Sequence, residues 1–94
     1  MGTYEMKTPH QLAKQIEHLT TLRVTEVEET DDPTIEDDSI TIQDGEITWD
    51  IQICAMDNGR LCLNQWLDDE TMKHSKMYSN IPSLVKSELP QFLR

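Results

Sequence analysis

The chain has 94 residues, the size of one small domain, and 36% of them are apolar, which is enough for a small core. Its formal net charge of −10, from 18 acidic and 8 basic residues, argues against free binding to DNA, RNA or an anionic membrane, because like charges repel. The sequence has no apolar run long enough to cross a membrane and no signal-type apolar stretch after Met1. We therefore expect a single compact acidic domain over residues 1–94, located in the cytoplasm.

The first predicted element is a helix over residues 9–20. Thr8 is a suitable N-cap, Pro9 suits the first helical position, and Gln11 can complete a capping box. The apolar residues then recur at helical spacing: Leu12, Ala13, Ile16 and Leu19. This pattern predicts a helix with one apolar face.

A strand is predicted over residues 22–28. Val27 breaks the alternation of apolar and polar residues, which indicates a bulge or an early end. A loop follows over residues 30–34, because Pro33 cannot donate a hydrogen bond to a neighbouring strand.

The clearest pattern is a hairpin made of residues 39–43 and 46–54, joined by the turn dipeptide Asp44-Gly45. A two-residue loop at this dipeptide predicts the following pairs: Gln43 with Glu46, Ile42 with Ile47, and Ile40 with Trp49. One face of the hairpin is then apolar and carries Ile40, Ile42, Ile47, Trp49, Ile51 and Ile53.

A second turn is predicted at residues 57–59. A three-residue loop with Gly59 in the left-handed conformation keeps the apolar face continuous, by pairing Ala55 with Leu61 and Ile53 with Leu63. In this register Cys54 faces Cys62 on the opposite side of the sheet. We expect two thiols in a reducing compartment, with a strained cross-strand disulfide as the alternative.

The C-terminal third is predicted as a strand over residues 60–67, an acidic entry to a helical turn at 68–70, and a final helix. Residues 71–78 are compatible equally with a short helix and with an ordered loop. Asn80 or Ser79 caps the final helix, which has Pro82 in its first turn. Its apolar residues are Ile81, Leu84, Val85 and Leu89, and Pro90 ends or kinks it, so that Phe92 and Leu93 fold back onto the core. The predicted fold class is α+β: a single antiparallel sheet of about four strands with helices packed on one face, in the order α-β-β-β-β-α.

The sequence contains no recognisable catalytic, metal-binding or phosphate-binding motif. His10 and His18 are too far apart on the first helix to share a metal ion, and no cysteine pair or glycine-rich loop has a known spacing. His74 is also expected at the surface. We therefore expect a protein that is not an enzyme and that needs no metal or cofactor.

The charges are strongly segregated along the chain. No Lys or Arg occurs from Val24 through Gly59, and 12 of the 18 acidic residues lie in this stretch. Carboxylates two residues apart on one face of a strand, as expected for Glu26 and Glu28, lie about 6.6 Å apart. Such a row fits the Arg and Lys side chains of a basic protein surface. The candidate partner-binding residues are Glu26, Glu28, Glu29, Asp31, Asp32, Glu36, Asp37, Asp38, Asp44, Glu46 and Asp50, with Trp49 or Trp66 as an anchor if either is exposed.

In size, acidity and predicted element order, the chain resembles small phage-encoded inhibitors such as anti-CRISPR proteins and other nucleic-acid mimics, and the bacterial immunity proteins that block nuclease toxins. No motif carries this resemblance. It implies an inhibitor that occupies the nucleic-acid-binding surface of a nuclease, a CRISPR effector or a DNA-binding protein. The alternative is a regulatory or structural subunit of a larger complex, whose acidity serves only solubility. A homo-oligomer is compatible with either interpretation.

Overall fold

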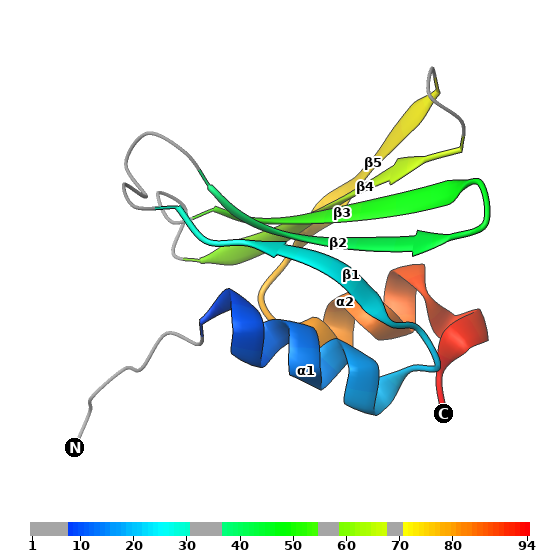
Figure 1. The fold of residues 1–94 in the computed structure, drawn as a ribbon, viewed down its shortest axis with the longest axis horizontal. Coiled ribbons are helices and arrows are strands. Elements are labelled where there is room, and N and C mark those ends of the chain that lie inside the picture. The colour runs from blue at the N-terminus through cyan, green and yellow to red at the C-terminus, as the bar shows by residue number, and fades with distance from the viewer. Residues whose placement is uncertain (1–7, 31–36, 55–58, 68–70) are drawn as a thin grey trace.

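The computed structural model describes residues 8–30, 37–54, 59–67 and 71–94. They form an α+β fold in which an antiparallel five-stranded sheet, in the order β1-β2-β3-β4-β5, carries two α-helices on one face (Figure 1). The elements are α1 (Pro9–Leu19), β1 (Val24–Glu28), β2 (Asp38–Asp44), β3 (Ile47–Cys54), β4 (Arg60–Trp66), β5 (Met72–Tyr78), α2 (Ile81–Glu88) and a short 3-10 helix, η2 (Pro90–Phe92). The prediction of about four strands was therefore one short.

The start of α1 is the predicted capping box. The Thr8 backbone N–H donates to Gln11 Oε1 over 2.9 Å, and the Gln11 N–H donates to Thr8 Oγ1 over 3.2 Å. Two backbone donors that a helix start leaves unpaired are thereby satisfied. The helix ends at Leu19, and the buried Thr20 hydroxyl donates to the carbonyl of Ile16 over 2.7 Å.

The β2–β3 hairpin has the predicted faces but a different register. Asp44 pairs with Ile47, Ile42 with Trp49, and Ile40 with Ile51. The two-residue turn is therefore Gly45-Glu46, with Gly45 at φ 64° in its first position, where a glycine is favoured. The predicted turn at Asp44-Gly45 was wrong by one residue. Each residue of β2 therefore pairs with a β3 residue two positions beyond the predicted one. A shift by an even number of residues keeps each side chain on its predicted face.

The same kind of shift occurs between β3 and β4. Ile53 pairs with Leu61 and Ile51 with Leu63, so five residues, 55–59, connect the paired ends of these strands instead of three. Residues 55–58, including Ala55, lie outside the described residues, but Gly59 has the predicted positive φ, 73°. Cys62 lies opposite Gln52 instead of Cys54, and both cysteines are thiols. The diagonal positions that the two cysteines occupy are typically about 7–8 Å apart, too far for a disulfide without a backbone shift.

The strand β5 corrects the prediction of a short helix or loop over residues 71–78. Asn64 pairs with His74 and Cys62 with Met77, so three steps along β5 match two along β4. This irregularity interrupts the alternation of side chains, which is why the segment lacks a recognisable strand pattern. The predicted helical turn at 68–70 lies outside the described residues.

A comparable irregularity lies in β1, where Val24 pairs with Ile42 and Glu26 with Thr41. Because of this bulge, Val24 and Val27 lie on the same face of the sheet although they are three residues apart, and Val27 pairs with the buried Ile40. The predicted bulge in this strand is therefore confirmed.

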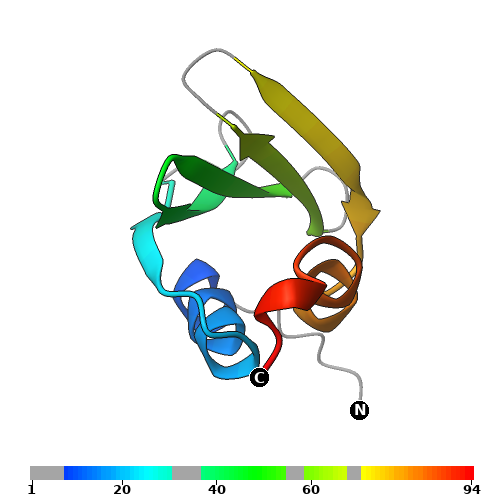
Figure 2. The same cartoon turned by 90° about the vertical axis from the view of Figure 1, so that its right-hand side faces the viewer.

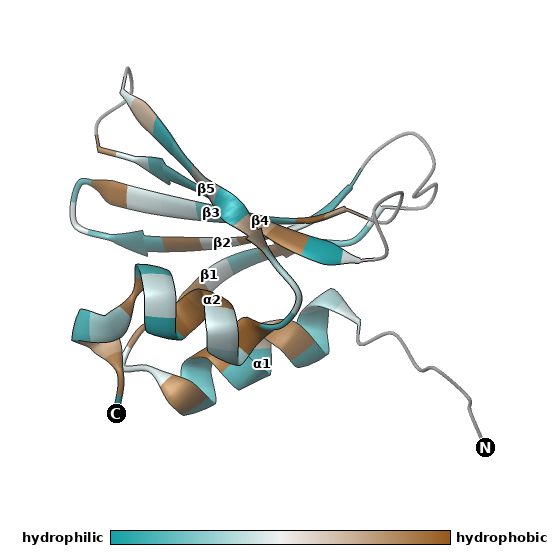
Figure 3. Cartoon of the chain, turned by 180° about the vertical axis from the view of Figure 1, so that it is seen from behind, coloured by the Kyte–Doolittle hydropathy of each residue, from teal (hydrophilic) through white to brown (hydrophobic). Residues whose placement is uncertain are grey.

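Both helices cover the same face of the sheet, which we call the inner face (Figure 2). The apolar sides of α1 and α2 point toward the sheet (Figure 3). The core residues there are less than a tenth exposed: Leu12, Ala13, Ile16, Leu22, Ile40, Ile42, Trp49, Ile51, Ile53, Leu61, Leu63, Ile81, Leu84, Val85 and Leu89. The opposite side, the outer face, is covered by neither helix.

The chain end folds back onto this core, as expected from Pro90. Phe92 packs edge-to-face against Trp49, with ring centroids 5.4 Å apart and an interplanar angle of 79°. Leu93 stays 40% exposed, although its backbone bridges that of Thr20. Asn80 caps α2 by accepting from the Ser83 N–H over 2.9 Å.

Candidate functional site

Two glutamates of β1 point to the outer face. Glu26 pairs with Thr41 and Glu28 with Ser39, whereas Val27, between them, pairs with the buried Ile40. The two glutamates are exposed and lie on the edge strand of the sheet. The prediction that they share one face is therefore confirmed.

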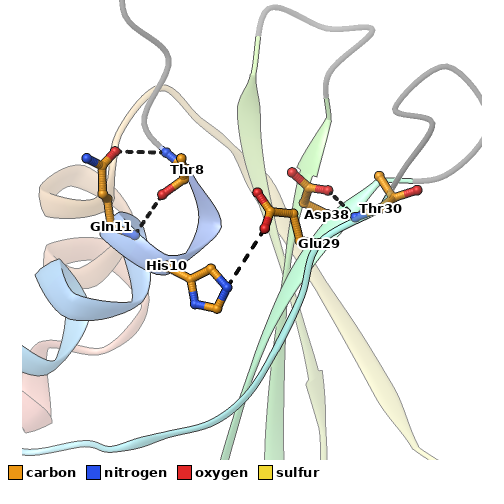
Figure 4. Close-up of polar contacts among 6 residues, drawn as sticks. All are labelled: Thr8, His10, Gln11, Glu29, Thr30 and Asp38. Atoms are coloured by element: carbon orange, nitrogen blue, oxygen red, sulfur yellow. Dashed lines mark hydrogen bonds and ion pairs between the residues drawn. The ribbon is translucent and has the colours of Figure 1, made fainter.

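More carboxylates gather where β1 ends and β2 begins. Asp38 Oδ1 accepts from the Thr30 backbone N–H over 2.8 Å, which draws the two chain segments together (Figure 4). Glu29 Oε2 lies 3.9 Å from His10 Nε2 on α1, in a pair in which both side chains are more than half exposed. Exposed pairs of this kind add little stability. We call the carboxylates at this border of the sheet the acidic edge: Glu26, Glu28, Glu29, Asp37 and Asp38.

Asp50 adds one more carboxyl group in the middle of the outer face, on the central strand β3. Across the sheet, Glu26, Thr41, Asp50, Asn64 and His74 occupy successive paired positions, so they form one row from β1 to β5. Asp50 is half-buried. Its pKa is raised from its ordinary value, first by burial and then by the nearby negative charge of Glu28.

The other predicted site residues do not join this group. Asp44 and Glu46 are exposed at the β2–β3 turn, at the opposite end of β2 from Ser39; Asp44 precedes the turn and Glu46 is its second residue. The four-residue step from Ser39 to Gln43 alone corresponds to about 13 Å along a strand. Asp31, Asp32 and Glu36 lie outside the described residues. The structure thus divides the predicted acidic surface into the acidic edge and a separate pair at the turn.

A polar cluster in the middle of the outer face was missed by sequence reasoning. The Asn64 side chain is 5% exposed; its Nδ2 donates to Gln52 Oε1 over 3.3 Å, and its Oδ1 lies 2.6 Å from His74 Nδ1. The one available signal was Asn64 itself, a polar residue following the buried Leu61 and Leu63 on the same strand. His74 gave no signal, because the sequence pattern did not predict its strand.

Cys62 lies beside this cluster, but its thiol does not have the lowered pKa that is typical of a nucleophilic cysteine. Its Sγ lies 4.0 Å from Asn64 Oδ1, the same oxygen that His74 contacts. The pKa of the Cys62 thiol is raised by burial and by the charge of Asp50. A raised pKa reduces the thiolate fraction, and the thiolate is the nucleophilic form.

The two tryptophans lie on opposite faces. Trp49 is 2% exposed in the core, so it cannot anchor a partner, whereas Trp66 pairs with Thr48 and Met72 on the outer face and is partly exposed. Of the two anchors considered from the sequence, Trp66 alone is accessible.

Within the described ranges, no three His, Cys, Asp or Glu side chains gather as a metal-binding group. The helices in that part of the chain are also too short or too polar to cross a membrane. Comparison with protein-family models, with curated proteins and with solved structures finds no match to this chain.

Proposed function

We propose that the protein is a non-enzymatic inhibitor that binds a basic nucleic-acid-binding protein or nuclease through the acidic edge and Asp50. This is the kind of activity that anti-CRISPR and immunity proteins have. The observation that carries the proposal is the position of Glu26 and Glu28, which project from the outer face of an edge strand. Glu29 and Asp38 add negative charge at the same border, on its helix-covered side.

The spacing of these charges suits a surface that binds nucleic acid. Side chains two residues apart on a strand are separated by about 6.6 Å, roughly twice the 3.4 Å axial rise per phosphate of one DNA strand. Arg and Lys side chains are long and mobile enough to follow either spacing. The partner would thus meet carboxylates where it normally meets phosphates.

The acidic edge also has an electrostatic cost that a binding role would offset. Like charges on neighbouring strands destabilise a sheet, and the charge of Glu28 contributes to the raised pKa of Asp50. Each exposed ion pair with a partner is worth only about 0.2–1 kcal/mol. Several together steer association and determine which partner is bound.

The test compares two double variants that each remove two negative charges. Glu26→Gln with Glu28→Gln changes the acidic edge, and Asp44→Asn with Glu46→Gln changes the separate turn at the other end of β2. Immobilised wild-type protein first isolates partners from a cell extract at low salt. A partner is accepted only if it is purified, binds duplex DNA or RNA, and is displaced from the column by that nucleic acid.

We expect the acidic-edge variant to lose at least tenfold in affinity for this purified partner, and the turn variant to stay within about twofold, since steering depends on where the charge lies. Both variants should remain folded, with melting temperatures equal to or above that of the wild type, because repulsion is relieved. Equal losses in the two variants, or an extract that yields no nucleic-acid-binding protein displaced in this way, would contradict the proposal.

A second candidate is favoured by the apolar residues of the uncovered face. Met72 and Met77 are each 37% exposed on β5, and Met72 is paired with the partly exposed Trp66. This surface would suit a subunit of a larger complex, or of a homo-oligomer, in which the acidity serves solubility. Salt separates the two functions: binding through the acidic edge weakens steeply between low and high ionic strength, whereas an apolar interface does not weaken.

A further inference from the structure

Three side chains with sulfur or nitrogen donors occupy neighbouring paired positions on the outer face of β4 and β5. Cys62 and Met77 are directly paired across the two strands, and His74 follows at the next paired position, opposite Asn64. The irregularity in the register of β5 lies between His74 and Met77, and such irregularities re-aim the neighbouring side chains. The result is a thiol, a thioether and an imidazole on one patch that neither helix covers.

Asn64 contacts two of these side chains. Its Oδ1 lies 4.0 Å from Cys62 Sγ and 2.6 Å from His74 Nδ1, so one amide oxygen contacts both the thiol and the imidazole. Asn64 Nδ2 donates to Gln52, which makes Oδ1 the accepting atom toward His74. His74 Nδ1 therefore carries the hydrogen, and Nε2 keeps a lone pair for another ligand. Metal-binding histidines are typically oriented by a bond of this kind from the second ring nitrogen.

The electrostatic surroundings also favour a cation. The carboxyl group of Asp50 lies close enough to Cys62 for its negative charge to act on the sulfur. The same field attracts a positive ion to the thiol. Met77 is 37% exposed and His74 is exposed, so an ion can reach the patch from solvent.

We propose that this patch binds one Cu(I) ion through Cys62 Sγ, His74 Nε2 and Met77 Sδ. Thiolate and thioether ligands select Cu(I), and imidazole is also a good copper ligand. On binding, the S–H bond of Cys62 breaks, the sulfur binds the ion, and the proton passes to solvent. Asn64 acts as a positioning residue that holds the imidazole. The three ligands lie outside the acidic edge, and the site shares only the charge of Asp50 with the surface proposed to bind a partner.

The experiment titrates the purified full chain with Cu(I) under anaerobic conditions, against a chromophoric Cu(I) chelator, and counts bound ions by native mass spectrometry. One ion per chain is expected. The test variants are Cys62→Ser, His74→Gln and Met77→Leu. The chain offers a matched control for each: Cys54→Ser on the same face, His18→Gln on α1, and Met72→Leu, which is on the same strand and equally exposed at 37%.

Each test variant should lower Cu(I) affinity at least tenfold, with the largest loss for Cys62→Ser, while each control stays within about threefold of the wild type. Circular dichroism and urea unfolding establish that the variants remain folded. If a test variant unfolds, the εCH3 signal of Met77 and the ring signals of His74 in the NMR spectrum of the wild type must shift on Cu(I) addition. A loss for Cys54→Ser equal to that for Cys62→Ser would assign the ion to a pair of thiols, and would overturn the proposal. No binding, or no shift at Met77 and His74, would overturn it as well.

Discussion

Asp50 occupies the middle of the row that crosses the outer face, between Thr41 and Asn64. Its pKa is raised by burial, the larger cause, and by Glu28. The neutral form of this carboxyl is therefore favoured by folding. Its contribution to stability is complete below the ordinary pKa of 3.8 and is lost as the pH rises through the raised pKa of the folded state.

Replacing Asp50 with Asn should consequently stabilise the protein at pH 7, because the amide resembles the neutral acid in shape. The gain should shrink toward zero at about pH 3, where the wild-type carboxyl is itself protonated. Urea unfolding at a series of pH values measures it. Asp44→Asn, at the exposed turn, provides the baseline for removing one charge, and an equal gain from Asp44→Asn at pH 7 would contradict the role of burial.

At the scale of elements, the β2–β3 hairpin depends on the backbone of Gly45. Its φ is 64°, and an added Cβ would meet nothing within 4 Å. Any cost of a side chain at this position is therefore backbone strain and not a steric clash.

Gly45→Ala should cost about 1–2 kcal/mol, the usual penalty of the left-handed conformation. Gly45→Asn should cost less, because asparagine adopts this conformation more readily. Denaturant midpoints of the two variants test the ranking. An alanine variant as stable as the wild type would mean that the turn rearranges without strain.

At the scale of the whole molecule, one core joins both helices to the inner face of the sheet. Ile51 is 0% exposed at its centre, whereas Ile47, on the same face of β3, is only partly buried against the core. The outer face, in contrast, carries Glu26 and Glu28 of the acidic edge, Asp50 and the proposed copper-binding patch. Stability and the proposed functions are thus assigned to opposite faces of one sheet.

Ile51→Ala should cost about 2–5 kcal/mol through lost burial and the cavity left behind. Ile47→Ala removes the same atoms from a partly solvated position and should cost clearly less. Both values follow from urea unfolding. A loss below about 0.5 kcal/mol for Ile51 would place it outside the core, in conflict with its burial.

Local patterns in the sequence determined much of this fold. The capping box of Thr8, the apolar face of α2 and the inner face of the central strands all follow from short-range periodicity and turn chemistry. The shared face of Glu26 and Glu28 was predictable for the same reason. These features depend on residues within a few positions of one another.

Only the tertiary structure decided the rest. The pairings of Ile42 with Trp49 and of Ile53 with Leu61 differ from the predicted pairings by two residues, and burial patterns alone do not distinguish registers that differ by an even number. The strand β5 exists because β4 offers it a partner, although an extra residue hides its alternation. The cluster around Asn64 and the separation of Asp44 and Glu46 from the acidic edge likewise depend on cross-strand pairing. Such pairing is a contact between distant residues, so no local pattern records it.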